Sequence, residues 1–391
     1  MSNAKARYAR GAAARGTSNR LKVNRKVAAK FLKFCRGSSV SCEVETLGRY
    51  HVWEGPRIKI RASAGRALIE RHYGVAGHAA VELCKWTKDA IEGGRSCYKV
   101  KFYNAPAGGS HRCVEMSPVG LVCSNRCVYC WRPTEEFDAF MLDERFYMEP
   151  EEVVKAVLEE RRRLLSGYWG HSQGRLRMKE ALEPTHWAIS LSGEPTMYPK
   201  LPQLIKLIKS LPSTKSVFLV TNGQHPEMLR RLVEEDALPT QLYLSTNAPN
   251  KELYYKINVP VYHREDAWER WLESLDILAT IPTRTVLRIT LIRSLNYDDK
   301  YIPEFAQIVK RGNPHFVEVK SYMHLGHSTF RLKKEDMLSH EEVKQWAMKL
   351  LAELEKIGAR FRYMDDDEPS RIVVLQNMDR YVDRWIVPPG N

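Results

Sequence analysis

The chain has no long apolar run. No segment approaches the roughly 18 consecutive apolar residues that cross a membrane, and the N-terminus lacks the apolar stretch of a secretory signal. We therefore expect a soluble, intracellular protein, located in the cytoplasm or alternatively in the mitochondrial matrix. The 391 residues, 43% hydrophobic and 28% charged, suffice for one large catalytic domain with appendages or for two modest domains.

Acidic residues are absent from the first 36 positions, which hold eleven Lys and Arg. This tail supplies +11 of the formal net charge of +14, so the remaining 355 residues carry only +3. A basic, acid-poor tail can neutralise the phosphates of a nucleic acid or act as an organelle transit peptide. It can also be a solvated extension without a role, and the sequence leaves the three interpretations open.

Cysteine is scarce outside one segment. Six of the eight Cys fall between Cys84 and Cys130, and in a chain of this length such clustering favours metal ligands over disulfides. Cys123, Cys127 and Cys130 form a CxxxCxxC triplet. Since thiolates usually hold all four irons of a cubane cluster, three Cys in one tight loop predict a cluster with one iron open to a small molecule.

The triplet, with the aromatic Tyr129 before its last Cys, resembles the radical S-adenosylmethionine superfamily. The resemblance implies a [4Fe-4S] cluster whose open iron binds S-adenosylmethionine, and a 5′-deoxyadenosyl radical as the reactive species. Two other interpretations stay open at this point. One is a zinc site that lacks a ligand, and the other is a set of structural thiols in a core.

From residue 117 onward, short β-branched or apolar runs alternate with amphipathic helical patterns, which favours βα units and a parallel sheet. The predicted strands are 117–122, 186–191, 217–221, 241–245, 286–292 and 316–321, and the helices between them are 150–165, 201–211, 226–235, 266–279 and 302–309. Six such units predict an α/β fold, a partial (β/α)6 barrel with function at the carboxyl ends of its strands. The resemblance to the radical S-adenosylmethionine superfamily implies the same barrel. A helix at 340–357 and a strand at 372–375 form a C-terminal extension.

Polar motifs follow three of the predicted strands. SGEPT at 192–196 includes Gly193, which lets the backbone approach a ligand closely, and Glu194; a GlyGlyGlu-like motif at this place holds the methionyl amine in the superfamily. Asn222, Ser245 and Asn247 offer groups suited to ribose hydroxyls and the carboxylate of the cofactor. Ordinary turns at strand ends are the alternative interpretation.

A second set of cysteines lies upstream: Cys84, Cys97 and Cys113. Three thiols so near a cluster loop suggest a second cluster, although buried free Cys is common. Lys99 follows Cys97 by two residues, and a Lys amine in a dry pocket can form a Schiff base with a carbonyl substrate. A Lys chosen at random is usually a surface residue, so spacing alone does not establish this role.

The chain resembles tRNA 4-demethylwyosine synthases of the wybutosine pathway, in the short form without a flavodoxin domain. The resemblance rests on CKWTK at 84–88, SCYKVKFY at 96–103, CVEMSP at 113–118, CSNRCVYCWRP at 123–133, SLSGEPTMYP at 190–199, QLYLSTNAP at 241–249, RTVLRITLI at 284–292, FVEVKSYM at 316–323, SHEEV at 339–343 and EPSRIVVL at 368–375. It covers about residue 66 to the end. We expect four parts: a basic extension at 1–65, a second-cluster segment at 66–116, the barrel at 117–330 and a C-terminal extension at 331–391.

The family resemblance assigns roles to residues of this chain. It implies that Cys123, Cys127 and Cys130 hold the S-adenosylmethionine cluster, that Cys84, Cys97 and Cys113 hold a second [4Fe-4S] cluster, and that Lys99 engages pyruvate. Tyr129, Gly193, Glu194, Asn222, Ser245 and Asn247 are the expected cofactor contacts. The chain departs from the family at Ser192, where a Gly is usual, and at Asn247, where an Asp is more frequent.

The implied reaction joins N1-methylguanosine at position 37 of a tRNA, expected to be a phenylalanine acceptor, to carbon from pyruvate and gives 4-demethylwyosine, with loss of the pyruvate carboxyl carbon. The base leaves the anticodon loop, with Trp131, Tyr254 and Tyr255 as stacking candidates and Arg132, Arg288 and Arg293 as phosphate candidates. The expected protein is a monomer served by an external flavodoxin or ferredoxin. The rivals are a radical enzyme acting on another RNA or peptide and a noncatalytic iron-sulfur RNA-binding protein.

Overall fold

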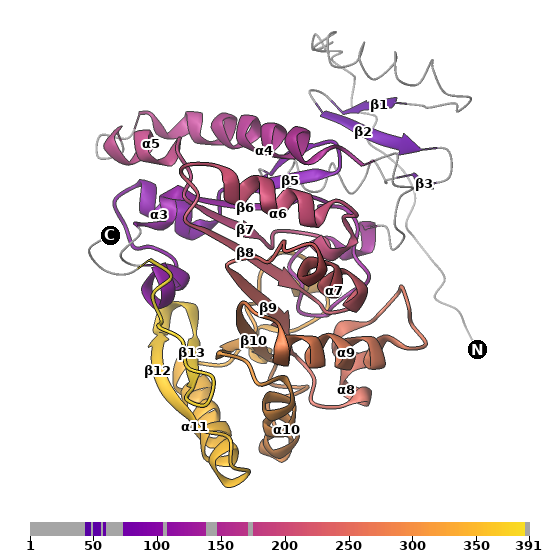
Figure 1. Ribbon diagram of the computed structural model, residues 1–391, viewed down its shortest axis with the longest axis vertical. Helices are drawn as coiled ribbons and strands as arrows, with labels where there is room; N and C mark the ends of the chain where they lie inside the picture. Colours follow the sequence, from indigo (N-terminus) through magenta and orange to yellow (C-terminus); the bar gives the residue numbers. More distant parts are fainter. Residues whose placement is uncertain are drawn as a thin grey trace, which may run out of the picture.

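One ten-stranded mixed sheet organises the protein (Figure 1). The computed structural model describes residues 44–47, 50–55, 58–59, 73–104, 108–137, 147–170 and 175–387. Neighbouring strands follow the order β12-β13-β11-β10-β9-β8-β7-β6-β5-β4. Because the order begins and ends on different strands, the sheet is open, and the predicted partial barrel is confirmed.

Six consecutive strands of this sheet run parallel: β6 (Cys113–Ser117), β7 (His186–Ile189), β8 (Ser216–Thr221), β9 (Gln241–Ser245), β10 (Arg284–Leu291) and β11 (Phe316–Ser321). Five of the six predicted strands are confirmed within two residues. The first prediction, 117–122, is wrong, since the strand is β6 and the segment after Ser117 turns. The apolar side chains Val119, Leu121 and Val122 are buried without joining the sheet.

Helices fill the connections, as predicted: α4 (Pro150–Leu165), α6 (Leu201–Ser210), α7 (Pro226–Glu234), α9 (Ala267–Thr280) and α10 (Ile302–Gly312). Helix α4 illustrates the local causes. Pro150 occupies its first turn, where a missing N–H costs nothing, and the Glu152 side chain accepts a hydrogen bond from the Glu149 N–H at 3.0 Å. Its buried residues recur at helical spacing, so one face packs and the other meets solvent.

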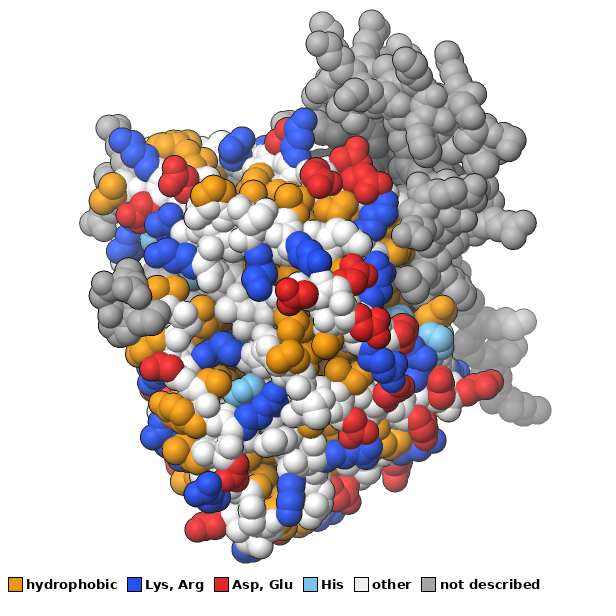
Figure 2. Space-filling view, viewed as in Figure 1, with side chains coloured by type: hydrophobic (Ala, Val, Ile, Leu, Met, Phe, Trp, Pro, Cys, Tyr) orange, Lys and Arg blue, Asp and Glu red, His pale blue; other side chains and the backbone are white. Residues whose placement is uncertain are grey.

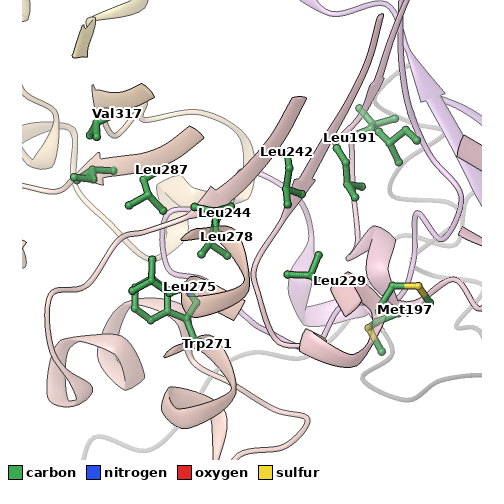
Figure 3. Close-up of a cluster of buried hydrophobic side chains, with 14 of the residues drawn as sticks. Leu191, Met197, Leu229, Leu242, Leu244, Trp271, Leu275, Leu278, Leu287 and Val317 are labelled. Atoms are coloured by element: carbon green, nitrogen blue, oxygen red, sulfur yellow. The ribbon is translucent and has the colours of Figure 1, made fainter. Parts of the chain in front are cut away.

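Strand side chains alternate between two apolar clusters. Outward-pointing Leu242, Leu244, Leu287 and Val317 belong to the large cluster, where they meet Trp271, Leu275 and Leu278 of α9 (Figure 3). Inward-pointing Phe218, Tyr243, Val286 and Phe316 form a second cluster with Tyr98, Phe102 and Tyr103. Tyr98 and Phe218 of this inner apolar cluster also line the cavity described below.

Antiparallel strands and additional helices flank the parallel core. One edge carries β4 (Gly74–Ala76) and β5 (Ala79–Glu82), and the other carries β13 (Ile372–Asn377) and β12 (Phe361–Asp367). Helix α11 (His340–Lys356) confirms the predicted C-terminal helix, and β13 confirms the last strand. The sequence prediction missed β4, β5 and β12 and the helices α3 (Lys85–Ile91), α5 (Arg175–Ala181) and α8 (Lys251–Asn258), which are short.

The basic tail at 1–36 and most of the predicted extension at 1–65 lie outside the described residues. Within that extension, β1 (Val44–Leu47), β2 (Tyr50–Gly55) and β3 (Ile58–Lys59) form a small antiparallel sheet that the sequence did not predict. Among the described residues, no helix has the length and apolar character needed to cross a membrane. Figure 2 shows basic and acidic side chains interspersed over the visible face.

Candidate active site

All six predicted cysteine ligands line one cavity of about 390 Å³. Each of the six parallel strands contributes to its wall, through Cys113 and Glu115, His186, Phe218, Ser245, Arg288 and Lys320 among others. The six Cys are free thiols. Two cysteine sets with different spacings therefore face the same cavity inside the barrel.

The Cys123–Cys127–Cys130 loop is held by backbone hydrogen bonds to the C-terminal end of α8 and to the segment that follows it. The Arg126 N–H donates to the carbonyls of Asn258 and Val259 at 3.2 and 3.0 Å, and the Val128 N–H donates to Ile257 at 2.9 Å. In return, the Val261 N–H donates to the Ser124 carbonyl at 2.9 Å. These contacts fix the loop that carries the three thiols.

Two arginines brace the same loop. Arg126 donates through Nη1 to the Cys123 carbonyl at 2.8 Å. Arg331, about 200 residues further along the chain, donates through Nη1 and Nη2 to the carbonyls of Cys127 and Cys130, each at 2.6 Å. Sequence reasoning missed both residues, and no motif could have indicated Arg331, because its role depends on a contact between distant segments.

The environment of the thiols fits iron-sulfur clusters. Burial raises the pKa of Cys127 and of Cys113 to about 12 and raises that of the other four Cys. Buried thiols of this kind become thiolates when a bound metal supplies positive charge. Within the described residues, no three Cys, His or carboxylate groups converge around one metal ion. A cubane needs a wider arrangement, because each thiolate binds a different iron.

The turn after β7 meets the cluster loop closely. Gly193 has a φ of +69°, and a Cβ there would lie 2.0 Å from the Val119 carbonyl oxygen and 2.5 Å from that of Val122. Only Gly fits this conformation and this space. Gly193 and Ser192 line the cavity, so the predicted motif lies beside the cysteine loop, and the Ser192 hydroxyl, which replaces the usual Gly, donates to the Gly120 carbonyl at 2.7 Å.

Glu194 forms hydrogen bonds within the protein. Its carboxylate is buried and is absent from the cavity lining. Oε1 accepts hydrogen bonds from the Thr196 N–H, the Thr196 hydroxyl and the Thr221 hydroxyl at 3.1, 2.6 and 2.7 Å, and Oε2 accepts from the Asn222 N–H at 2.8 Å. The carboxylate therefore ties the end of β7 to the end of β8, and the predicted contact of this side chain to a cofactor ammonium stays a prediction.

Asn222 and Asn247 also form hydrogen bonds within the protein. The Asn222 amide donates to Ser124 Oγ at 3.0 Å. The Asn247 amide donates to the Tyr129 hydroxyl at 2.6 Å, and its oxygen accepts from the Thr290 N–H at 3.1 Å. Neither residue lines the cavity, whereas Ser245 and Tyr129 do. In the structure, Asn222 and Asn247 thus support the cysteine loop and the ends of the strands.

The second cysteine set comes from three separate elements. Cys84 immediately precedes α3, Cys97 precedes a π-helical turn (Val100–Asn104), and Cys113 begins β6. Ser110 connects these segments, since its Oγ accepts from the Cys97 N–H at 3.2 Å and donates to the Trp86 carbonyl at 2.8 Å. The sequence predicted the grouping from the thiols alone and missed Ser110.

Lys99, Arg288 and Lys320 are cations that line the cavity. Lys99 Nζ lies 5.5 Å and 5.2 Å from the ring centroids of Phe218 and Tyr243. Arg288 and Lys320, from β10 and β11, line the same space. Burial, with the Arg288 charge as a further cause, lowers the pKa of Lys320 from 10.5 to about 8. Sequence reasoning missed Lys320, although its position on the inward face of a barrel strand was a usable signal.

The predicted RNA contacts divide into surface and interior residues. Trp131 lines the cavity and is 42% exposed, whereas Tyr254 is buried at 1% and packs on Trp268 and Trp271. Tyr254 is therefore a core residue, and its predicted stacking role is wrong. Tyr255 is half-buried and donates to the Arg264 carbonyl at 2.7 Å.

The predicted phosphate contacts are corrected in part. Arg132 is buried at 7% and lies 3.4 Å from Glu82, and Arg288 is inside the cavity, so neither offers a surface charge to a phosphate. Arg293 is exposed and forms an ion pair of 2.7 Å with Glu342. Arg132 and Arg288 lie in the interior, where each needs a partner for its charge, because an unpaired guanidinium is costly away from water.

Two family descriptions match this chain. Residues 117–306 match the radical SAM superfamily, and residues 311–377 match a family described as wyosine base formation. The first match contains the Cys123 loop and the strands β7 to β10. The second contains β11, α11 and the C-terminal strands.

Similar proteins extend over most of the chain. The S-adenosyl-L-methionine-dependent tRNA 4-demethylwyosine synthase of Pyrococcus abyssi is 39% identical over 79% of this chain and 87% of its own. The synthase of Methanocaldococcus jannaschii is 38% identical over 81% and 96%. A solved structure of TYW1 with a lysine-pyruvate adduct bound has a TM-score of 0.71 and 36% identity, over 83% of this chain and 99% of that one.

Proposed function

The chain belongs to the tRNA 4-demethylwyosine synthase family, and from this we propose that it converts N1-methylguanosine at position 37 of a tRNA into 4-demethylwyosine, using carbon from pyruvate. The match of residues 117–306 to the radical SAM superfamily makes it a radical S-adenosylmethionine protein. One observation carries the proposal: both cysteine sets and Lys99 line one cavity. A reaction that joins two substrates needs both to be held within one space.

The cofactor site is proposed at the carboxyl ends of β6 to β10. Cys123, Cys127 and Cys130 would hold the first cluster, and Tyr129, Gly193 and Ser245 would contact S-adenosylmethionine. When bound, the reduced cluster and S-adenosylmethionine supply a 5′-deoxyadenosyl radical that takes a hydrogen atom from the N1-methyl group. Gly193 suits this place because its missing side chain lets the backbone approach the cysteine loop.

A second [4Fe-4S] cluster is proposed at Cys84, Cys97 and Cys113. Support comes from the three separate segments that bring these thiols to one wall of the cavity. Lys99 lies two residues from Cys97, and its amine would add to the C2 carbonyl of pyruvate with loss of water, giving an imine. The relative solved with a lysine-pyruvate adduct supports this assignment.

The tRNA is proposed to approach the open end of the cavity, where Trp131 lies. A guanine that leaves the anticodon loop needs a surface on which to stack, and Trp131 is a half-exposed indole that lines the cavity. We also propose an external one-electron donor of the flavodoxin or ferredoxin type, a monomeric protein in the cytoplasm, and the four parts with boundaries at 65, 116 and 330.

The test is an anaerobic assay of the reconstituted protein with dithionite, S-adenosylmethionine, tRNA bearing N1-methylguanosine at position 37, and pyruvate labelled with ¹³C at C2 and C3. Nucleosides are digested and read by mass spectrometry. We expect a tricyclic product that carries both labels. If 5′-deoxyadenosine forms while the guanosine is unchanged, the substrate is another molecule; if neither forms with both clusters intact, the protein is a noncatalytic RNA-binding protein.

Lys99→Arg gives the matched variant, because Arg keeps the charge and cannot form the imine. We expect it to cleave S-adenosylmethionine and to yield no tricyclic nucleoside. Lys206→Arg, on the exposed face of α6, is the control and should behave as the unaltered protein. Product formation by Lys99→Arg at the unaltered rate would contradict the role of Lys99.

A further inference from the structure

Arg288 has one nitrogen that the protein leaves without a partner. Its Nε donates to Glu318 Oε2 at 3.0 Å, and Glu318 Oε1 accepts from the Tyr103 hydroxyl at 3.0 Å. The guanidinium lies over the Tyr243 ring, 4.4 Å from its centroid. Within the described residues, Nη2 is buried and makes no hydrogen bond. One edge of Arg288 is therefore fixed by Glu318 while the other remains available.

An unsatisfied charged N–H is costly away from water. Because Arg288 lines the cavity, a bound anion is the simplest partner for Nη2. The planar guanidinium suits a carboxylate in particular, since its nitrogens match the spacing of the two oxygens. The fixed Nε edge would hold Nη2 in place before the ligand binds.

Lys320 lies next to Arg288 on the same wall. It follows Glu318 by two residues on β11, so both side chains face the interior, and Glu318 pairs with Arg288 in the sheet register. In the part of the chain that the structure describes, the Lys320 ammonium has no hydrogen bond or ion pair. Arg288 and Lys320 thus bring two positive charges together with only one of them balanced by Glu318.

Lys99 approaches the same aromatic ring as Arg288. Its Nζ is 5.2 Å from the Tyr243 centroid, against 4.4 Å for the Arg288 guanidinium carbon. Of the described residues that line the cavity, Glu115 is the one carboxylate, so Lys99, Arg288 and Lys320 outnumber Glu115 and Glu318 together. The charge around Tyr243 is therefore positive and favours a small anion.

We infer that Arg288, through Nη2, and Lys320 bind the carboxylate of the α-keto acid whose carbonyl carbon meets Lys99. This inference rests on the proposed function. An α-keto acid carries its carboxylate one bond from its electrophilic carbon, so a site with cations beside a reactive amine binds and orients it in one step. A keto compound without a carboxylate would leave Nη2 and Lys320 unpaired and would bind poorly.

The decisive variant is Arg288→Lys. Its ammonium still pairs with Glu318, which protects folding, but it cannot offer a second nitrogen to the cavity at the same time. Lys320→Met is the second variant, and it removes the neighbouring charge while keeping the stem. Arg311→Lys is the control, because Arg311 pairs with Asp276 on the surface of α10 and lies away from the cavity.

Two measurements are made on each cluster-loaded protein. The first is the pyruvate concentration needed for borohydride trapping of the Lys99 adduct, read by peptide mass spectrometry in the absence of tRNA. The second is the KM for S-adenosylmethionine in 5′-deoxyadenosine formation. Methyl pyruvate, which lacks the charge, replaces pyruvate in a parallel trapping series.

We expect Arg288→Lys and Lys320→Met each to raise the half-saturating pyruvate concentration roughly 10- to 100-fold, the loss typical of a charge-assisted hydrogen bond. The KM for S-adenosylmethionine and the trapping of methyl pyruvate should change little, so the preference for pyruvate over its ester should collapse. Arg311→Lys should match the unaltered protein.

Three results would overturn the inference. A raised KM for S-adenosylmethionine with unchanged pyruvate trapping would assign the site to the cofactor carboxylate. A loss of iron from the variants would show that Arg288 and Lys320 support a cluster. An unchanged preference of the variants for pyruvate over its ester would show that Arg288 and Lys320 do not bind the carboxylate. If instead the unaltered protein traps no pyruvate on Lys99, the proposed function fails, and the two failures are thus distinguished.

Discussion

Glu194→Gln tests whether this carboxylate is a support of the fold or a cofactor ligand. The side chain receives four hydrogen bonds, three at Oε1 and one, from the Asn222 N–H at 2.8 Å, at Oε2. Gln preserves an acceptor for the first three, without the charge, and presents an amide N–H₂ to the Asn222 N–H. Losing one charge-assisted bond, weakening three and leaving a donor unpaired should cost about 2–4 kcal/mol. The unfolding midpoint should fall by roughly 2–5 °C.

The assay is thermal unfolding followed by circular dichroism, on the protein with and without S-adenosylmethionine. Glu234→Gln, on the exposed face of α7, is the control and should change stability by less than about 0.5 kcal/mol. We expect the destabilisation by Glu194→Gln to be the same whether or not the cofactor is present. An unchanged midpoint together with a weakened affinity for S-adenosylmethionine would refute the structural role and restore the direct contact.

Three further predictions follow from other contacts. Gly193→Ala places a Cβ 2.0 Å from the Val119 carbonyl oxygen and should cost about 3 kcal/mol or more; a midpoint equal to that of the unaltered protein in the same melt would contradict this. Arg331→Met removes the 2.6 Å bonds to the Cys127 and Cys130 carbonyls and should release iron from the first cluster while the second persists, as followed by electron paramagnetic resonance; equal loss from both would point to general unfolding. The hydrogen bond from Arg293 lowers the pKa of Glu342 from 4.5 to about 2, so its stabilisation is present above pH 4.5 and is lost as the pH falls toward 2. Glu342→Gln should therefore flatten the decline of stability in that window, and an unaltered acid limb would show that the pair contributes nothing.

Local patterns in the sequence were sufficient to predict the helices and strands at the core of the fold. The helix at 150–165 and the strands at 241–245 and 316–321 coincide with α4, β9 and β11, because their apolar spacing and their flanking Pro and polar residues act within a few positions. The first strand was misplaced because residues 118–122 are apolar and buried but lie outside the strands of the sheet. Burial and strand formation give the same apolar signal, and only pairing with β5 and β7 separates them.

For the candidate site, too, the sequence determined one part and the tertiary structure decided another. The sequence alone determined which atoms we propose to carry the chemistry, since the six thiols, Lys99 and Gly193 have properties that no other residue at those positions supplies. Tertiary structure decided where each side chain points: Glu194 and Asn247 turn into the framework, Arg288 moves from a proposed phosphate contact to the cavity wall, and Arg331 and Lys320 enter the site. The physical reason is that a side chain's direction and partners depend on strands and loops that are distant in sequence, and these meet only when the sheet curves around a common interior.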